Sequence, residues 1–294
     1  ILIRWCIVVW SLPHERSYGR QMRFIVWDKY HKAPMGLIGL QSPILSWSVR
    51  DKYLGIGPKD RDFWVNQSLN AQRLGALPPY NSIYGGKLVA SMMTTDYVRG
   101  KFKQKYSGIR TIMMDRKIPA DLLFLTTTGA FGKSSVYSKL KVNGDEVSKF
   151  LGYTQGMGSF HIPNFLYMDL IKYLKKLKYD IGRGYGNGPS RKIRLIDQAM
   201  TRLGFKSGTT HSVKRSVYLF PMAKNISDVI NKGARPKWHK RSQKTVADFW
   251  KKQWAIPRSE KDKTYLEFSK DQFIENTIKE MVEYKKVYKK LKSI

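Results

Sequence analysis

A run of apolar residues that ends in three threonines and a small-residue loop constrains the fold of this chain most strongly. Residues 122–125 (LLFL) are followed by residues 126–128 (TTT), a combination typical of a buried strand. The next loop, residues 129–135 (GAFGKSS), contains two glycines, two hydroxyls and a lysine, and leads into a short helical turn carrying Tyr137. Glycines let a backbone approach an anion or another ligand closely. The stretch 120–159 therefore predicts a strand, a ligand-facing loop, a tyrosine turn and a second strand.

Strands and helices alternate along the rest of the chain. The pattern of apolar residues predicts strands at residues 4–12, 22–28, 33–41 and 213–220, and an extended segment at 69–77. It predicts helices at residues 85–106, 164–178 and 191–203, and a short exposed helix within 58–66. We expect the segments 22–28 and 33–41 to pair as a hairpin across the turn DKYHK. This alternation predicts an α/β (α+β) fold with a mixed sheet flanked by helices.

The sequence changes in character after residue 222. We predict one domain over residues 1–222 and a basic arm over residues 223–294, which wraps a partner or lies over the domain. Near its end, Ser269 followed by Gln272 resembles a capping box, which predicts the start of a last helix. An apolar stripe runs along that helix, at Phe273, Ile274, Ile278, Met281, Val282 and Leu291. Such a stripe packs on its own protein in most cases, and the alternative is that it docks a protein partner.

The charge of the chain limits its partners. There are 54 lysines and arginines against 22 aspartates and glutamates, a formal net charge of +32. The last 71 residues, from Lys224 on, carry +10 of this excess and residues 1–223 carry +22, so the folded body is basic as well as the arm. A field of this strength attracts polyanions, of which nucleic acid is the commonest. The plain alternative is a lysine-rich but merely solvated surface, whereas a pure protein-interaction scaffold leaves the charge unexplained.

Other residue types exclude several classes of site. The single cysteine, Cys6, excludes an internal disulfide, and the five histidines lack the spacing of metal ligands, so we predict no metal. Only 13 acidic residues precede Lys224, and none is on the predicted central strand, which disfavours a metal-dependent nuclease. No apolar run has the length of a membrane span, and the first ten residues do not read as a signal peptide. We expect a soluble, cytoplasmic protein that does not bind membranes.

Basic residues with aromatic residues among them are the candidates for binding DNA or another nucleic acid, because they suit phosphate contact together with base stacking. The lysines of residues 101–105 (KFKQK) fit this description, and equally fit a solvated helix face. The candidates that we select are Arg73, Lys133, Arg183, Arg191, Lys192, Arg194, Lys237, Trp238, Lys240 and Arg241.

Several polar residues are candidates for chemistry. Tyr137 is placed to act as a general acid, although a tyrosine in such a turn more often packs. Ser135 and its neighbour Ser134 are placed to bind a substrate or to cap the tyrosine turn, and capping is the commoner role. Asn70 is a further candidate, with a surface pair with Arg73 as the alternative. Gly85, Gly86 and Lys87 open the helix predicted at 85–106, where free N–H groups favour a phosphate, or they form only a turn.

The order of these motifs resembles that of the DUF4338 family, the DruA-like proteins of Druantia anti-phage systems. The matching pieces are NAQRLGALP at residues 70–78, residues 132–137 and residues 151–158, within a resemblance that spans roughly residues 20–220. The same order of elements resembles the GNAT acyltransferase fold, and within that fold it is most similar to phage Mom proteins, which modify DNA adenine. Residues 126–128 (TTT) stand where DUF4338 members tend to carry acidic residues.

The resemblance implies a site and an activity. Carried over to this chain, Gly85, Gly86 and Lys87 would face the pyrophosphate of acyl-CoA, and residues 74–77, with Leu74 and Leu77, would border its pantetheine arm. Tyr137 would be the acid. The implied function is that of a DNA-binding GNAT-like acyltransferase that modifies a nucleobase amine in a phage or anti-phage system. The rival is a non-catalytic nucleic-acid-binding subunit of a defence or mobile-element complex.

Overall fold

The computed structural model describes residues 2–10, 19–111, 114–130, 132–159, 162–182 and 191–293. The chain forms two compact units, each taken by itself below. The first, here called the sheet unit, comprises Ile1–Gly152 and Ser216–Lys286. The second, the helical unit, comprises Tyr153–Arg215 and Val287–Ile294.

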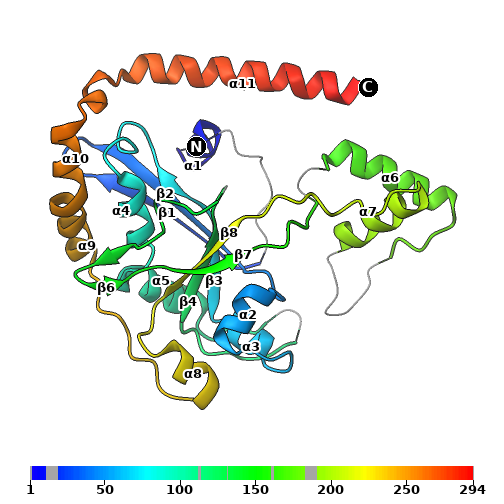
Figure 1. Cartoon of the computed structure of the whole chain (residues 1–294), viewed down its shortest axis with the longest axis horizontal. Helices are drawn as coiled ribbons and strands as arrows, with labels where there is room; N and C mark the ends of the chain where they lie inside the picture. Colours follow the sequence, from blue (N-terminus) through cyan, green and yellow to red (C-terminus); the bar gives the residue numbers. More distant parts are fainter. Residues whose placement is uncertain are drawn as a thin grey trace. The chain divides into compact units, whose positions relative to one another are not determined.

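A mixed sheet with the strand order β1-β2-β3-β4-β8-β7 forms the centre of the sheet unit (Figure 1). Its strands are β1 (Gln21–Asp28), β2 (Ala33–Gln41), β3 (Ser68–Ala76), β4 (Phe124–Thr128), β8 (Ser216–Pro221) and β7 (Lys149–Tyr153). The strands β1, β2 and β3 are antiparallel, as are β4 and β8, whereas β3 and β4 are parallel. The predicted hairpin is confirmed, with Gln21 opposite Gln41 and Asp28 opposite Ala33. The predicted mixed sheet flanked by helices is therefore confirmed.

The connection between the parallel strands β3 and β4 contains two helices rather than the one predicted for residues 85–106. These are α4 (Gly85–Met92) and α5 (Asp96–Tyr106). The break comes at Thr94 and Thr95, whose hydroxyls donate hydrogen bonds of 2.8 Å to the carbonyls of Ser91 and Met92. Such local side-chain bonds compete with the helical ladder, and Thr95 takes an extended conformation before α5. Gly100, a residue type that weakens helices, does not cause the break, because it lies inside α5.

The first described segment is a helix, α1 (Leu2–Val9), so the strand predicted at residues 4–12 is wrong over its described part. A short apolar run suits a buried strand or a buried helix equally, and packing decides between them. Here Cys6 is fully buried in a small cluster with Leu37 of β2 and Leu77. No helix in the described ranges is both long enough and apolar enough to span a membrane.

The main hydrophobic core lies between one face of the sheet and helices α4, α5 and α9 (Gln243–Trp250). On the opposite face, α1 covers part of β2, and a separate cluster joins β4 and β8 to α2 (Ser48–Leu54) and α8 (Ile226–Lys232). The remaining elements of this unit are α3 (Arg61–Val65), the small hairpin of β5 (Lys141–Val142) and β6 (Asp145–Glu146), and α10 (Ile256–Lys261). The short exposed helix predicted within residues 58–66 corresponds to α3.

Up to Lys286, the basic segment after residue 222 is part of the sheet unit, and its helix α9 packs on the core, which is one of the two arrangements predicted for the segment. Val246 and Trp250 of α9 belong to the main core, and the Trp250 indole N–H donates to the carbonyl of Tyr84 at 3.1 Å. The last helix, α11 (Lys270–Ser293), begins as predicted, because the Gln272 N–H donates to Ser269 Oγ at 3.3 Å. Its stripe is largely exposed, with 55% of Ile278 and 49% of Met281 accessible, and Phe273 packs on Trp5.

The helical unit is built on α6 (Asn164–Lys176) and α7 (Arg191–Arg202), which agree closely with the predicted helices. The two helices pack on each other through Leu170, Leu174, Leu195 and Ile196, all buried. Residues 153–215 carry 12 lysines and arginines against three acids, so this unit is basic in its own right.

Candidate nucleic-acid interface

The glycines expected to face a pyrophosphate lie under protein side chains. At the start of α4, the Gly85 N–H donates to Tyr80 O at 2.8 Å and the Lys87 N–H to Tyr84 O at 3.0 Å. A Cβ at Gly86 would meet the methyl groups of Val136 at 3.4 and 3.5 Å. The ammonium of Lys87 lies 4.9 Å from the ring centre of Trp254, and burial lowers its pKa. The start of α4 is therefore packed by the tyrosine turn and the arm.

The expected pantetheine and acid residues are also internal. Leu74 packs against the main core, whereas Leu77 is 1% exposed and joins Cys6 on the opposite face of the sheet. The Tyr137 ring packs edge-on against Tyr218 and Phe220, with centroids 5.3 and 5.8 Å away. Burial raises the pKa of Tyr137 to about 12. Acyl-CoA binding and proton donation by Tyr137 stay predictions.

The loop hydroxyls and Asn70 have structural partners. Ser134 Oγ accepts the Val136 N–H at 3.2 Å, which is the capping role expected for this serine pair, while Ser135 is exposed. Asn70 Oδ1 accepts a bond of 3.0 Å from the Thr126 hydroxyl, at the last paired position of β3 and β4. The Thr127 hydroxyl then donates to Ala71 O at 2.8 Å. The threonines thus bridge the two parallel strands where their ladder ends.

A hollow beside α5 combines cations with an aromatic face. The guanidinium of Arg99 lies 4.4 Å from the ring centre of Trp238, a close cation–π contact. The hollow has a volume of about 260 Å³ and is also lined by Asp96, Gly100, Lys103, Ala120 and Asp121. Arg99 pairs with Asp96 at 2.8 Å, while Lys103 is exposed. Sequence reasoning selected Trp238 but missed Arg99, although its place two residues before Lys101 on a basic helix was a usable signal.

The cluster 237–241 divides into exposed and internal cations. Lys237 and Lys240 are exposed, whereas Arg241 is 2% exposed. One Arg241 guanidinium nitrogen donates to Glu146 O at 3.0 Å, and its backbone exchanges two bonds with Asp96, of 3.0 and 3.1 Å. The structure therefore places Arg241 as a tie between the arm and the earlier part of the sheet unit, at Asp96 and Glu146.

Further cations rest on aromatic rings in both units. Lys133 lies over Phe150, with Nζ 4.9 Å from the ring centre, in the sheet unit. In the helical unit, Lys192 lies over Tyr167 at 5.4 Å, and Arg202, which sequence reasoning missed, lies over Tyr179 at 4.6 Å.

Two more candidates in the helical unit hold backbone carbonyls after α6. Arg191 and Arg194 each donate a bond of 2.8 Å, to Ile181 O and Gly182 O respectively. Arg183, the remaining candidate of this unit, lies outside the described residues.

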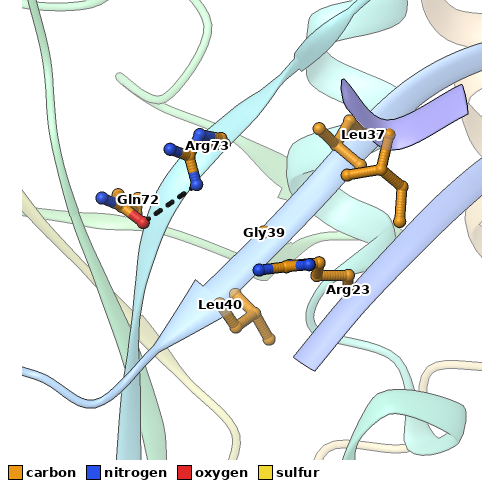
Figure 2. Close-up of a pocket in the computed structure, with 7 residues that line it drawn as sticks. Arg23, Leu37, Gly39, Leu40, Gln72 and Arg73 are labelled. Atoms are coloured by element: carbon orange, nitrogen blue, oxygen red, sulfur yellow. Dashed lines mark hydrogen bonds between the residues drawn. The ribbon is translucent and has the colours of Figure 1, made fainter. Parts of the chain in front are cut away.

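Arg73 belongs to a cross-strand row on the face of the sheet that α1 partly covers. Gly39 of β2 pairs with Arg23 of β1 on one side and with Arg73 of β3 on the other. Figure 2 shows the two arginines on either side of Gly39, around a small hollow that Leu37 and Leu40 also line. Sequence reasoning missed Arg23, since only the register of three strands brings it level with Arg73.

Within the described residues, no group of three His, Cys, Asp or Glu side chains is placed to hold a metal ion.

Comparison with known proteins gives one consistent result. A family model described as Druantia protein DruA matches residues 1–232. Among curated proteins, Druantia protein DruA of Escherichia coli (strain UMEA 4076-1) is 34% identical over 269 residues, which cover 90% of this chain and 67% of that protein. No solved structure matches, so the GNAT-like character of the sheet and the similarity to Mom proteins stay predictions.

Proposed function

Because the chain belongs to the Druantia protein DruA family, we propose that it is a nucleic-acid-binding component of an anti-phage defence system, with DNA as its partner. The excess of cations carries this proposal. Even if each of the 22 acids paired with a different cation, 32 of the 54 cations would have no acid partner. Counterion release from phosphates then supplies affinity without regard to sequence.

The cation–aromatic contacts support single-stranded nucleic acid in particular. In the hollow beside α5, Arg99 lies over the ring of Trp238, and Lys103 lines the same hollow together with Asp96 and Asp121. An aromatic face beside cations suits an unpaired base and its phosphate, and such stacking contributes about 1–3 kcal/mol per base.

The experiment is a binding titration of a fluorescent oligonucleotide by anisotropy, with single-stranded and duplex forms of one sequence. Trp238→Leu is expected to weaken single-strand binding about tenfold, through the loss of one stacking contact. The matched control is Trp27→Leu, which removes a tryptophan that is 46% exposed on β1. Thermal melting of both variants checks that they fold. Equal affinities for the wild type and the folded Trp238→Leu variant would exclude the hollow as a base-stacking site.

Acyl transfer to a nucleobase amine is the second proposal. One observation favours it: the tyrosine turn and the glycine start of α4 meet, through Val136 beside Gly86. The side chains as packed do not fit a pyrophosphate there, because Val136, Trp250 and Trp254 surround the place. We therefore derive no transfer step through acyl-CoA. Calorimetric titration with acetyl-CoA, with Gly86→Asp as control, tests this proposal, and the absence of heat with the wild type would end it.

A further inference from the structure

The turn between β1 and β2, residues 29–32 (KYHK), is built from residue types that a tight turn does not favour. Turns favour glycine, proline, asparagine, aspartate and serine, because these residues fit the turn backbone or bond to it, and none of them occurs at these four positions. Lys32 has φ +50°, in the left-handed region where glycine is free of strain. Strain of this kind gathers at sites that bind a ligand or a partner. The residues of the turn therefore suit a contact better than they suit the conformation.

One carboxylate, that of Asp28, fixes the turn. Its Oδ1 atom accepts the backbone N–H groups of Tyr30 at 2.8 Å and of His31 at 3.2 Å. Its Oδ2 atom lies 2.7 Å from His31 Nδ1 and accepts the hydroxyl of Tyr80 at 2.8 Å. Tyr80 belongs to the main core, so the turn is tied to the body of the sheet unit. A surface that is fixed in advance loses less conformational freedom when it binds.

The fixed turn presents an aromatic ring to the solvent. Tyr30 is 88% exposed, more than any other large apolar side chain in the described part of the chain. Its ring meets that of His31 edge-on, with centroids 4.8 Å apart and an angle of 83° between the planes. A contact of this kind covers at most one face of the Tyr30 ring. The other face is therefore open to a partner.

Two cations accompany this ring and limit what the partner can be. Lys29 and Lys32 flank Tyr30 and His31 in the chain, and both lysines are exposed. Asp28, the acid nearest to them in the sequence, pairs with His31 instead. An apolar partner would bury the two ammonium groups without a counter-charge, which is costly. The surface therefore fits a partner that is anionic and also offers a flat aromatic face.

We propose that the β1–β2 turn binds single-stranded nucleic acid, with Tyr30 stacked on an unpaired base and Lys29 and Lys32 near the phosphates on either side of it. A base inside a duplex has both faces covered by its neighbours, whereas an unpaired base offers a face to a protein ring. This inference rests on the proposed function, which supplies the partner, and it adds a contact that shares no residue with the hollow beside α5. Trp27 belongs to β1 and lies outside the turn.

The test is an anisotropy titration with two fluorescent single strands of equal length, one complete and one abasic. The abasic strand keeps the phosphates and lacks the bases. Tyr30→Leu is expected to weaken binding of the complete strand about tenfold, through the loss of one stacking contact, and to leave binding of the abasic strand unchanged. Tyr30→Phe keeps the ring, and its affinity for the complete strand is expected to stay within about twofold of the wild type, since stacking needs the ring and not the hydroxyl.

Tyr284→Leu is the matched control. Tyr284 is 64% exposed and is followed by Lys285 and Lys286, so it has a similar composition around it, but it lies on α11 and not in a fixed turn. This variant is expected to bind both strands as the wild type does. Thermal melting of all three variants checks that they fold.

The outcomes separate failure of the turn from failure of the proposed function. A wild type that binds neither strand at low salt would refute the proposed function, and the turn would lose its partner with it. A wild type that binds the complete strand no better than folded Tyr30→Leu does would refute the turn alone. A loss in Tyr30→Leu that is as large for the abasic strand, or that Tyr284→Leu reproduces, would also overturn stacking on Tyr30.

Discussion

Replacement of Arg241 by methionine separates a structural cation from its exposed neighbours. The Arg241 side chain is 2% exposed and its guanidinium donates to Glu146 O at 3.0 Å, while a second contact, to Pro221 O, is at the 3.5 Å limit and contributes little. A hydrogen bond from a charged group contributes about 1.5–3 kcal/mol, and its loss leaves the Glu146 carbonyl without this donor. Methionine keeps the apolar stem of the side chain but carries no charge. The cost of burying a guanidinium, which also lowers the pKa of Arg241, is therefore absent from the variant and offsets part of the loss. We expect a net loss of about 2 kcal/mol in the free energy of unfolding.

The assay is urea denaturation, with Lys240→Met as the control, because Lys240 is exposed one residue away. Lys240→Met is expected to change the free energy of unfolding by less than about 0.5 kcal/mol, as most surface substitutions do. The two variants are expected to exchange roles in DNA binding. Lys240→Met lowers the salt dependence of the DNA association constant, whereas folded Arg241→Met leaves that salt dependence unchanged. Unfolding free energies for Arg241→Met within about 0.5 kcal/mol of the wild type would refute the assignment of Arg241 as a tie between the arm and the earlier part of the sheet unit.

Three further predictions follow from local geometry. Burial tends to raise the pKa of Asp28, but hydrogen bonds from His31, Tyr80 and two backbone N–H groups lower it to about 2. The ionised carboxylate therefore stabilises the fold fully above about pH 4, and this stabilisation is lost as the pH falls toward 2. In acid titrations monitored by circular dichroism, Asp28→Asn is expected to remove this pH-dependent part of the stability. In thermal melts, Gly100→Ala is expected to stabilise the protein by about 1 kcal/mol, because nothing lies within 4 Å of its Cβ position in α5. Gly55→Ala is expected to destabilise it, because Gly55 has φ +71° and a Cβ there would clash with Asn231 Oδ1. Ile278→Lys is expected to leave the melting temperature unchanged, because Ile278 is exposed. If the stripe on α11 docks a protein partner, the substitution weakens that complex in size-exclusion chromatography. A lowered melting temperature would mean that the stripe packs on its own chain.

The predicted fold was most accurate where the pattern of residues decides the conformation by itself. The hairpin of β1 and β2 follows from two apolar segments that flank the turn DKYHK, and the strand β4 follows from the LLFLTTT run, whose residues are buried on both faces of the sheet. The helix α1 did not follow, because only the burial of Cys6 against Leu37 decides between helix and strand for its apolar run. The break between α4 and α5 depends on two threonine hydroxyls that helical periodicity ignores.

Less of the candidate site than of the fold could be predicted from the sequence. Lys237, Lys240 and Arg241 form one basic patch in the sequence, yet contacts with Asp96 and Glu146, far away in the chain, make Arg241 internal. The glycine start of α4 was recognised as a distinct motif, but the side chains over it come from residues 136, 250 and 254, and no local pattern announces them. The row of Arg23, Gly39 and Arg73 needs the register of three strands, including the irregularity after Gly39.

The salt dependence of DNA binding tests the central claim most directly. The association constant of the wild-type chain for a single-stranded oligonucleotide is measured by anisotropy from about 50 to 200 mM salt. If cations on the surface of both units contact phosphates, the logarithm of the constant falls linearly with the logarithm of the salt concentration, with a slope of roughly −0.7 for each phosphate contacted. We predict a slope of about −3 or steeper. Binding that does not change across this range, or no binding at the lowest salt, would contradict the claim that this chain recognises nucleic acid through its positive charge.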